Sequence, residues 1–148
     1  MQFNHTVHHA RDTRRSARRV RAGNEEILRV LAMNEKLMVV QRETCTRFGA
    51  PYFGCDLNLK VGISRNVKEG LRPLNGLRIE PEGDTCGWYI WAGEQYSDAP
   101  DFFVPLHASH LEAWAPLIIP YLGLPPGWRF LITEQYEDFW KDPNLLVE

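Results

Sequence analysis

Two short runs of β-forming residues, 88–92 (WYIWA) and 128–133 (WRFLIT), constrain the fold more than any other feature of the sequence. Tryptophan, tyrosine, isoleucine and phenylalanine favour the pleated, half-buried surface of a strand. Successive side chains of a strand point to opposite faces, so Trp88 and Trp91 lie on different faces of the first run. Because both faces carry large apolar side chains, we expect this strand to be central and covered on both sides.

A helix is predicted over 24–48, before these strands. Asn24 is a favourable N-cap, acidic residues follow it in the first turn, and Gly49 can end the helix. The apolar stripe is weak at 33–36, where the pattern allows a break. The step into Pro51 prevents the helix from continuing.

A second helical segment is predicted between the two strand runs. Ser109 and Glu112 form an S-x-x-E capping box, which indicates a helix start. Pro116 and Pro120 each remove one internal hydrogen bond of a helix. We therefore expect two short helical pieces with a kink between them.

The remaining pattern predicts further short strands at 57–64, 77–79, 101–104 and 136–140, separated by glycine- and proline-rich turns such as the one with Gly70, Pro73, Asn75 and Gly76. At 148 residues the chain is the size of one domain. The fold class is predicted as α+β, a single domain with a mainly antiparallel sheet packed with an N-terminal helix and a Pro-kinked helix.

Charge is distributed unevenly along the chain. Residues 1–22 carry six arginines and one acid, whereas 23–148 carry 11 bases and 18 acids. We predict a basic flexible arm over 1–22 and the single α+β domain over 23–148, whose net negative charge suits a basic partner. The arm is either a solvated extension or a tether to the phosphates of nucleic acid or an anionic membrane; nucleic-acid binding is not expected elsewhere.

No apolar run approaches the length of a membrane span, and the first residues lack the apolar middle of a secretory signal. These patterns predict a cytoplasmic protein. Cys45, Cys55 and Cys86 are odd in number and contain no C-x-x-C pair, so they are expected to be reduced, structural thiols. The sequence leaves the oligomeric state open.

Few residue patterns indicate catalysis. His107 and His110 are three positions apart and could share a helix face, and with Glu94 they define an alternative function, a small metal-dependent hydrolase. A nucleophilic pair of Cys86 and His107 is a weaker alternative. No nucleophile elbow, phosphate-binding loop, dinucleotide fingerprint or H-E-x-x-H segment is present. We therefore expect no catalytic residues, no bound metal and no cofactor, and predict that the protein is not an enzyme.

Several blocks in 60–146 resemble one protein family. The blocks VGIS, PLNGLR, GWYIWAGE, DFFVPLHASHL, PYLGLPPGWRFLI and YEDFWKDPNLL occur in this order. They resemble bacterial immunity-protein family thirty-three, formerly a domain of unknown function, and QRETCTRFGAPY is similar to the helix that leads into that domain. The likeness spans about 41–146 and leaves 1–22 outside. The motif and structural positions are held here by Trp88, Gly93, Pro126, Gly127, Trp128 and Trp140.

This resemblance implies an immunity, antitoxin-like protein that binds a toxin domain of a polymorphic toxin system and blocks its active or substrate surface. The family supplies no catalytic residues or contact map to carry over. Our prediction of the toxin-binding residues rests instead on their position on or just after the 88–92 strand, among exposed acids. These residues are Trp91, Glu94, Tyr96, Asp98 and Asp101.

Overall fold

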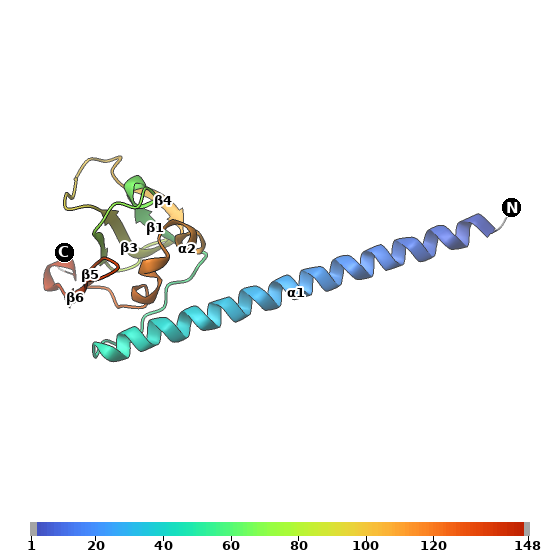
Figure 1. Ribbon diagram of the computed structural model, residues 1–148, viewed down its shortest axis with the longest axis horizontal. Coiled ribbons are helices and arrows are strands. Elements are labelled where there is room, and N and C mark those ends of the chain that lie inside the picture. Colours follow the sequence, from blue (N-terminus) through green and yellow to red (C-terminus); the bar gives the residue numbers. More distant parts are fainter. Residues whose placement is uncertain (1–2, 147–148) are drawn as a thin grey trace. The chain divides into compact units, whose positions relative to one another are not determined.

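A computed structural model describes the backbone of residues 3–146 and the side chains of residues 14–146 (Figure 1). The chain divides into two compact units, Met1–Lys36 and Leu37–Glu148. The predicted arm begins in residues 1 and 2, which lie outside the described part. Its predicted boundary at residue 22 stays a prediction.

Helix α1 spans Phe3–Arg47. The predicted helix is confirmed over most of its length, but its predicted start at Asn24 is wrong, because the preceding alanines and arginines favour a helix and no proline interrupts them. The break allowed at 33–36 does not occur either. Gly49, with a φ of +66°, follows the last turn, and the Ala50 amide donates to the Cys45 carbonyl at 2.9 Å. In residues 3–146 no helix has both the length and the apolar character required to span a bilayer.

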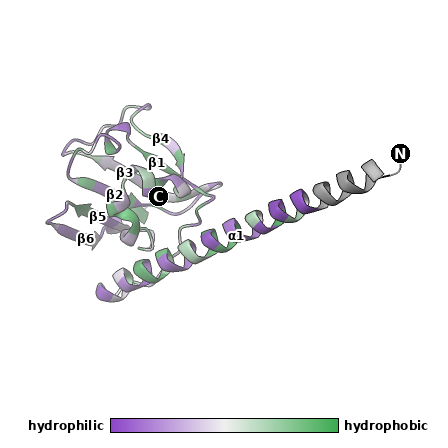
Figure 2. Ribbon diagram, turned by 45° about the vertical axis from the view of Figure 1, so that its right-hand side comes forward, coloured by the Kyte–Doolittle hydropathy of each residue, from purple (hydrophilic) through white to green (hydrophobic). Residues whose placement is uncertain are grey.

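The second unit contains one six-stranded sheet in the order β4-β1-β3-β2-β5-β6 (Figures 1 and 2). Strands β1 and β3 are parallel and the other four neighbouring pairs are antiparallel, which confirms the α+β prediction with a mainly antiparallel sheet. The strands span Lys60–Ile63 (β1), Leu74–Arg78 (β2), Thr85–Ala92 (β3), Val104–His107 (β4), Trp128–Ile132 (β5) and Glu137–Lys141 (β6).

The hydrophobic core lies on one face of this sheet, which we call the inner face. Trp88 and Phe130 are each 1% exposed there, and the Trp88 Nε1 donates to the Leu122 carbonyl at 2.9 Å. The last turns of α1 join the same core, since Gln41 Nε2 donates to the Ile119 carbonyl at 3.1 Å and Cys45 contacts the Gly123 carbonyl. The core thus connects α1, the sheet and the segment after β4.

Two strand predictions differ from the structure. The predicted strand 101–104 begins later, as β4, which pairs with β1. The loop predicted at Asn75 and Gly76 is part of β2. Gly76 lies under the Phe130 ring, where a Cβ atom would have no room, so this glycine serves close packing between strands and not a turn.

The predicted capping box is also wrong. Ser109 lies in a 3-10 turn, Ala108–His110, and its amide donates to the Leu57 carbonyl at 3.1 Å. The helix α2 begins one residue after this turn, as Leu111–Trp114, and a 3-10 helix follows over Pro116–Tyr121. The segment therefore forms two short pieces, as predicted, with Pro116 at the break and Pro120 inside the second piece.

A bidentate ion pair connects the end of α1 with β6. Arg47 Nη2 lies 2.7 Å from Glu137 Oε1, and Nη1 lies 3.3 Å from Oε2. The hydrogen bond from Arg47 lowers the pKa of Glu137. Both side chains remain partly exposed, at 55% and 32%.

Replacing Glu137 by glutamine should lower the free energy of unfolding by about 0.5–1 kcal/mol at neutral pH, because an exposed bidentate pair contributes about that much. The folded-state pKa of Glu137 is lowered, so its contribution is present above the ordinary carboxyl pKa and is lost as pH falls through the lowered value. Urea unfolding at neutral and acid pH checks this. The difference from the unmodified protein should vanish in acid, and a difference independent of pH would contradict it; Glu43→Gln on the exposed side of α1 is the control.

Candidate binding surface

The outer face of the sheet, opposite the core, carries a row of large side chains. The strand register aligns Tyr89, Leu77, Arg129 and Trp140 across β3, β2, β5 and β6. Tyr89, Leu77 and Arg129 are half-buried, and Trp140 is 37% exposed. Trp91, two residues after Tyr89 on β3, points to the same face. The outer face therefore presents aromatic rings and a guanidinium, residue types enriched at protein interfaces.

A loop over 93–103 follows β3 and returns to β4. It begins at Gly93, whose φ of +88° is a backbone conformation that favours glycine. The Gly93 amide donates to the Pro73 carbonyl, and Asn75 Nδ2 donates to the Gly93 carbonyl, both at 2.9 Å. Within the loop, the Phe102 amide donates to the Ala99 carbonyl at 3.0 Å. These bonds fix the start and the end of the loop.

Aromatic rings hold the loop against β3. The Tyr96 ring centroid lies 5.3 Å from that of Trp91 and 6.0 Å from that of Phe103. Phe103 also packs edge-to-face on Tyr89 at 5.2 Å, and Phe102 on Phe103 at 4.8 Å. Such pairs contribute about 0.5–1.5 kcal/mol beyond the area that they bury. The cluster makes the loop a preorganised surface instead of a mobile connection.

Three acidic side chains lie on this loop. Glu94, Asp98 and Asp101 are exposed, and none of them forms an ion pair with any residue from 14 to 146. By contrast, Asp84, Glu134, Glu137 and Asp142 pair with Lys60, Arg72, Arg47 and Arg129. The loop contains no lysine or arginine of its own, although Arg65 lines one pocket with Asp101, so it is a local concentration of negative charge around Tyr96, which is 53% exposed.

Arg129 connects this cluster with β6. Its guanidinium carbon lies 5.9 Å from the Trp91 ring centroid and 5.5 Å from that of Trp140, within the range of cation–π attraction. Its Nη1 also lies 3.3 Å from Asp142 Oδ2. Arg129 therefore holds two outer-face tryptophans in place.

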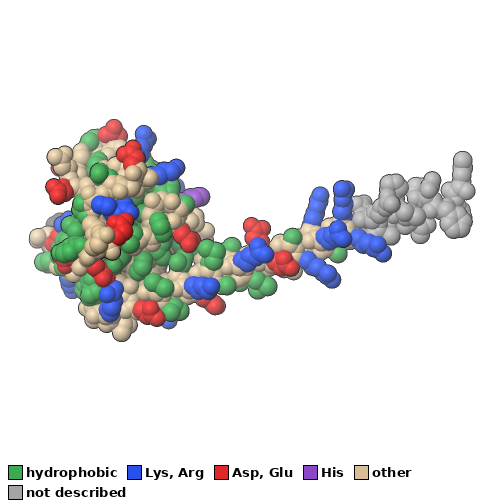
Figure 3. All heavy atoms as spheres, in the orientation of Figure 1, with side chains coloured by type: hydrophobic (Ala, Val, Ile, Leu, Met, Phe, Trp, Pro, Cys, Tyr) green, Lys and Arg blue, Asp and Glu red, His purple; other side chains and the backbone are tan. Residues whose placement is uncertain are grey.

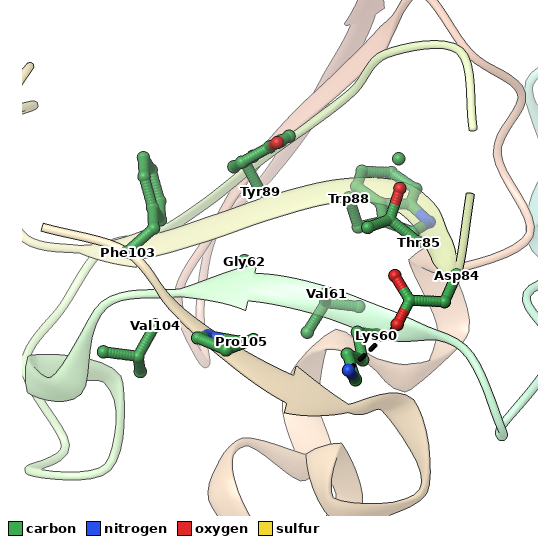
Figure 4. Close-up of a pocket in the computed structure, with 11 residues that line it drawn as sticks. Lys60, Val61, Gly62, Asp84, Thr85, Trp88, Tyr89, Phe103, Val104 and Pro105 are labelled. Carbon is green, nitrogen blue, oxygen red and sulfur yellow. Dashed lines mark ion pairs between the residues drawn. The ribbon is translucent and has the colours of Figure 1, made fainter. Parts of the chain in front are cut away.

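A shallow groove crosses the outer face over β1, β3 and β4 (Figure 4). Tyr89 lies across Gly62, where an added Cβ would come within 2.7 Å of the tyrosine ring, so glycine is required for this ring position. Phe103 lies at one end of the groove, and the Lys60–Asp84 ion pair, at 2.9 Å, lies at the other. The groove is thus a continuation of the aromatic surface beside the loop.

The five predicted binding residues lie in one stretch of the chain, but they differ in solvent exposure. Glu94, Tyr96, Asp98 and Asp101 are exposed, whereas Trp91 is 4% exposed beneath Tyr96. Sequence reasoning missed Phe103 and Arg129, whose contacts bring the loop and the outer face together. The register of β2, β3 and β5 creates that juxtaposition, and no spacing in the sequence indicates it.

Most residues at the motif positions of the family blocks make contacts that stabilise the fold. Trp88 is buried on the inner face, and Gly127, with a φ of +94°, donates its amide to the Arg78 carbonyl at 2.7 Å. Pro126 precedes that turn and Trp128 follows it as the first residue of β5. Trp140 contacts Arg129 on the outer face.

The two histidines considered as metal ligands are neighbours, but they lack further ligands. The rings of His107 and His110 are nearly parallel, with centroids 6.5 Å apart. No group of three or more histidine, cysteine, aspartate or glutamate side chains that could hold a metal ion occurs in the described part of the chain. Glu94, the third residue of that alternative, does not join them in such a group.

The Cys86 and His107 pair is not assembled as a nucleophilic site. Cys86 is 1% exposed and belongs to the core, whereas His107 is exposed on β4. The neighbouring Cys55 thiol lowers the pKa of Cys86 through a side-chain hydrogen bond, against the effect of burial. All three cysteines are free thiols. A buried thiol paired with another thiol is not accessible to a substrate.

Comparison with protein families matches residues 40–142 to a family model described as the Imm33-like domain. The match spans about seven-tenths of the chain and confirms the resemblance found in the sequence. It contains the whole sheet, the 93–103 loop and the last turns of α1, and it excludes the earlier part of that helix. No curated protein and no solved structure matches the chain.

Proposed function

The chain belongs to the Imm33-like domain family, and on that premise we propose that it is an immunity protein that binds a protein toxin and blocks its active or substrate-binding surface. The observation that carries the proposal beyond the family name is the 93–103 loop. It combines an exposed tyrosine, a rigid aromatic support and three unpaired acids. An inhibitor that acts by covering its target needs such a surface, and it needs no cofactor.

We propose that Tyr96 is the central anchor of the interface, with Glu94, Asp98 and Asp101 around it. Tyrosine is enriched among residues whose truncation weakens binding strongly, and half of its surface is available here. The buried Trp91 supports Tyr96 from below and does not itself contact the toxin. In this arrangement the exposed residues recognise the partner and the buried tryptophan positions them.

The charge of the loop favours a basic target surface. Complementary charge accelerates association and excludes wrong partners. Toxins that act on nucleic acids or other anionic substrates carry basic clefts, and an acidic loop inserted there would occupy the place of the substrate. A stable complex buries about 1,200–2,000 Å² in total, so the groove beside the loop is expected to contribute area as well.

Co-expression tests this function directly. Cells of a sensitive bacterium that produce a candidate toxin domain, chosen from the genes adjacent to the one for this chain, should stop growing, and growth should be restored when the full chain is co-produced. The purified chain should also inhibit the purified toxin at a one-to-one ratio, because the proposal requires blocking and not turnover. An unrelated toxin domain is the control for specificity.

Failure of rescue together with failure to form a complex with that toxin would overturn the proposal. A complex that leaves the toxin fully active would contradict the blocking mechanism. Inhibition by amounts of the chain far below those of the toxin would indicate an enzyme that modifies or degrades it.

A further inference from the structure

In the exposed part of α1 that precedes the family match, basic and apolar residues lie on opposite sides of the helix. At 3.6 residues per turn, the residues of 14–31 fall into two sets that each occupy less than half of the helix circumference. One set is basic and contains Arg14, Arg15, Arg18, Arg19, Arg21 and Arg29, and the other is apolar and contains Val20, Ile27, Leu28, Val30 and Leu31. The segment is therefore an amphipathic helix with a basic polar face.

The apolar side of this segment is uncovered. Val20, Ile27 and Leu28 are 60%, 59% and 65% exposed, and Val30 and Leu31 are 50% and 53% exposed. Figure 2 shows hydrophobic and hydrophilic residues alternating along this helix, and Figure 3 shows lysine and arginine side chains along its basic part. A row of large apolar side chains at helical spacing, each about half exposed, indicates a surface that meets a partner.

We propose that residues 14–31 bind an anionic lipid surface, lying in its plane with the apolar face toward the acyl chains and the arginines among the headgroups. The charge of the segment favours an anionic partner, because 14–31 contains six arginines and only two acids, Glu25 and Glu26. A long arginine side chain can extend its guanidinium to a phosphate while its alkyl stem stays beside apolar groups. Basic amphipathic helices bind membrane interfaces through these two contributions together.

A lipid surface would contact more of the side chains of this segment than nucleic acid or a second copy of the chain would. Nucleic acid would use the arginines and leave five large apolar side chains exposed to water. A second copy of the chain, packed along the apolar face, would cover those side chains, but it would bring twelve arginines onto one short bundle. Of these three partners, only an anionic lipid interface uses both faces.

This inference is independent of the proposed toxin binding. It concerns residues of the first unit, outside the family match at 40–142, whereas the toxin surface lies in the second unit. Loss of one activity should leave the other intact.

Vesicle sedimentation with the full chain tests the proposal. The protein should bind vesicles of phosphatidylcholine with phosphatidylglycerol and should not bind vesicles of phosphatidylcholine alone. Changing Arg14, Arg18 and Arg29 together to glutamine should weaken binding roughly 100-fold, because each basic residue near an anionic surface contributes about a five-fold factor. Glutamine preserves the helix, which circular dichroism can verify.

A second variant separates lipid from the other partners. Ile27→Gln with Leu31→Gln keeps every charge and should weaken vesicle binding at least ten-fold, because it removes two apolar contacts. The matched control is Met33→Gln with Val40→Gln, which removes two comparably exposed apolar side chains from the arginine side of the helix and should leave binding unchanged. The toxin complex should survive all three variants.

Three results would overturn the proposal. The first is the absence of binding to anionic vesicles at low salt. The second is binding of duplex DNA or RNA that is lost in the arginine variant but kept in the Ile27 and Leu31 variant. The third is self-association without lipid, seen by sedimentation, that is lost in the Ile27 and Leu31 variant.

Discussion

Replacing Arg78 by methionine should lower the free energy of unfolding by about 3–5 kcal/mol, the cost of removing one member of a buried, hydrogen-bonded charge site. Arg78 is 1% exposed, and no carboxylate among residues 14–146 forms an ion pair with it. Its guanidinium instead donates to the backbone carbonyls of Phe53, Gly54, Cys86, Leu122 and Leu124, at 2.7–3.1 Å. Methionine fills much of the volume but donates to none of them.

The size of this effect follows from the position of the five carbonyls. They belong to the segment after α1, to β3 and to the turn before β5, which are far apart in the sequence, so one side chain holds three parts of the domain together. The guanidinium is poorly solvated, since Arg78 is 1% exposed, and this burial lowers its pKa. A buried carbonyl that loses its donor costs about 1–3 kcal/mol, and water can replace only some of the five bonds.

Urea unfolding followed by tryptophan fluorescence measures this change. Arg72→Met is the matched control, because Arg72 is also an arginine near β2 but forms a partly exposed ion pair with Glu134. That control should cost less than about 1 kcal/mol. A cost below 1 kcal/mol for Arg78→Met would contradict the structural role assigned here.

The second large effect is expected on toxin affinity. Changing Tyr96 to alanine and Asp98 to asparagine together should weaken the complex roughly 100-fold, since an aromatic anchor contributes about 2 kcal/mol and an adjacent charge about 1 kcal/mol. The free protein should stay folded, because Asp98 is exposed and the aromatic cluster retains Trp91, Phe102 and Phe103, although it loses the ring contacts of Tyr96, each of which contributes about 0.5–1.5 kcal/mol. Titration calorimetry with the purified toxin domain measures the affinity.

The chain offers a closely matched control for this experiment. Tyr136 and Asp138 repeat the tyrosine-x-aspartate spacing at the β5–β6 turn, and Tyr136 is 54% exposed against 53% for Tyr96. Tyr136→Ala with Asp138→Asn should leave the affinity within about three-fold, on the ordinary scale of peripheral substitutions. Weakening by the control but not by the Tyr96 and Asp98 variant would place the toxin at the β5–β6 turn instead of the 93–103 loop.

Features that depend on local chemistry could be predicted from the sequence. The runs at 88–92 and 128–133 form β3 and β5 because aromatic and β-branched residues favour strands, and the proline-containing segment after β4 forms two short pieces as predicted. The family blocks predicted the match over 40–142. These signals act over a few residues and need no knowledge of the tertiary fold.

Features that depend on contacts between distant segments could not be predicted in this way. Gly76 appeared to be a turn residue because its packing partner, Phe130, is 54 positions away on a neighbouring strand. Arg78 lies within the strand predicted at 77–79, but nothing local indicates its five carbonyl partners. Similarly, Trp91 was predicted as a contact residue, but only the return of the loop over 93–103 places it beneath Tyr96.

Hydrogen exchange of the free and toxin-bound protein is the most direct measurement of where the partner binds. Backbone amides of the 93–103 loop should exchange at least ten-fold more slowly in the complex, together with those at the exposed end of the groove in β4, while the segment Pro116–Tyr121 should be unaffected. Slower exchange confined to that segment or to the β5–β6 turn, with the loop unchanged, would contradict the assignment of this surface to toxin recognition.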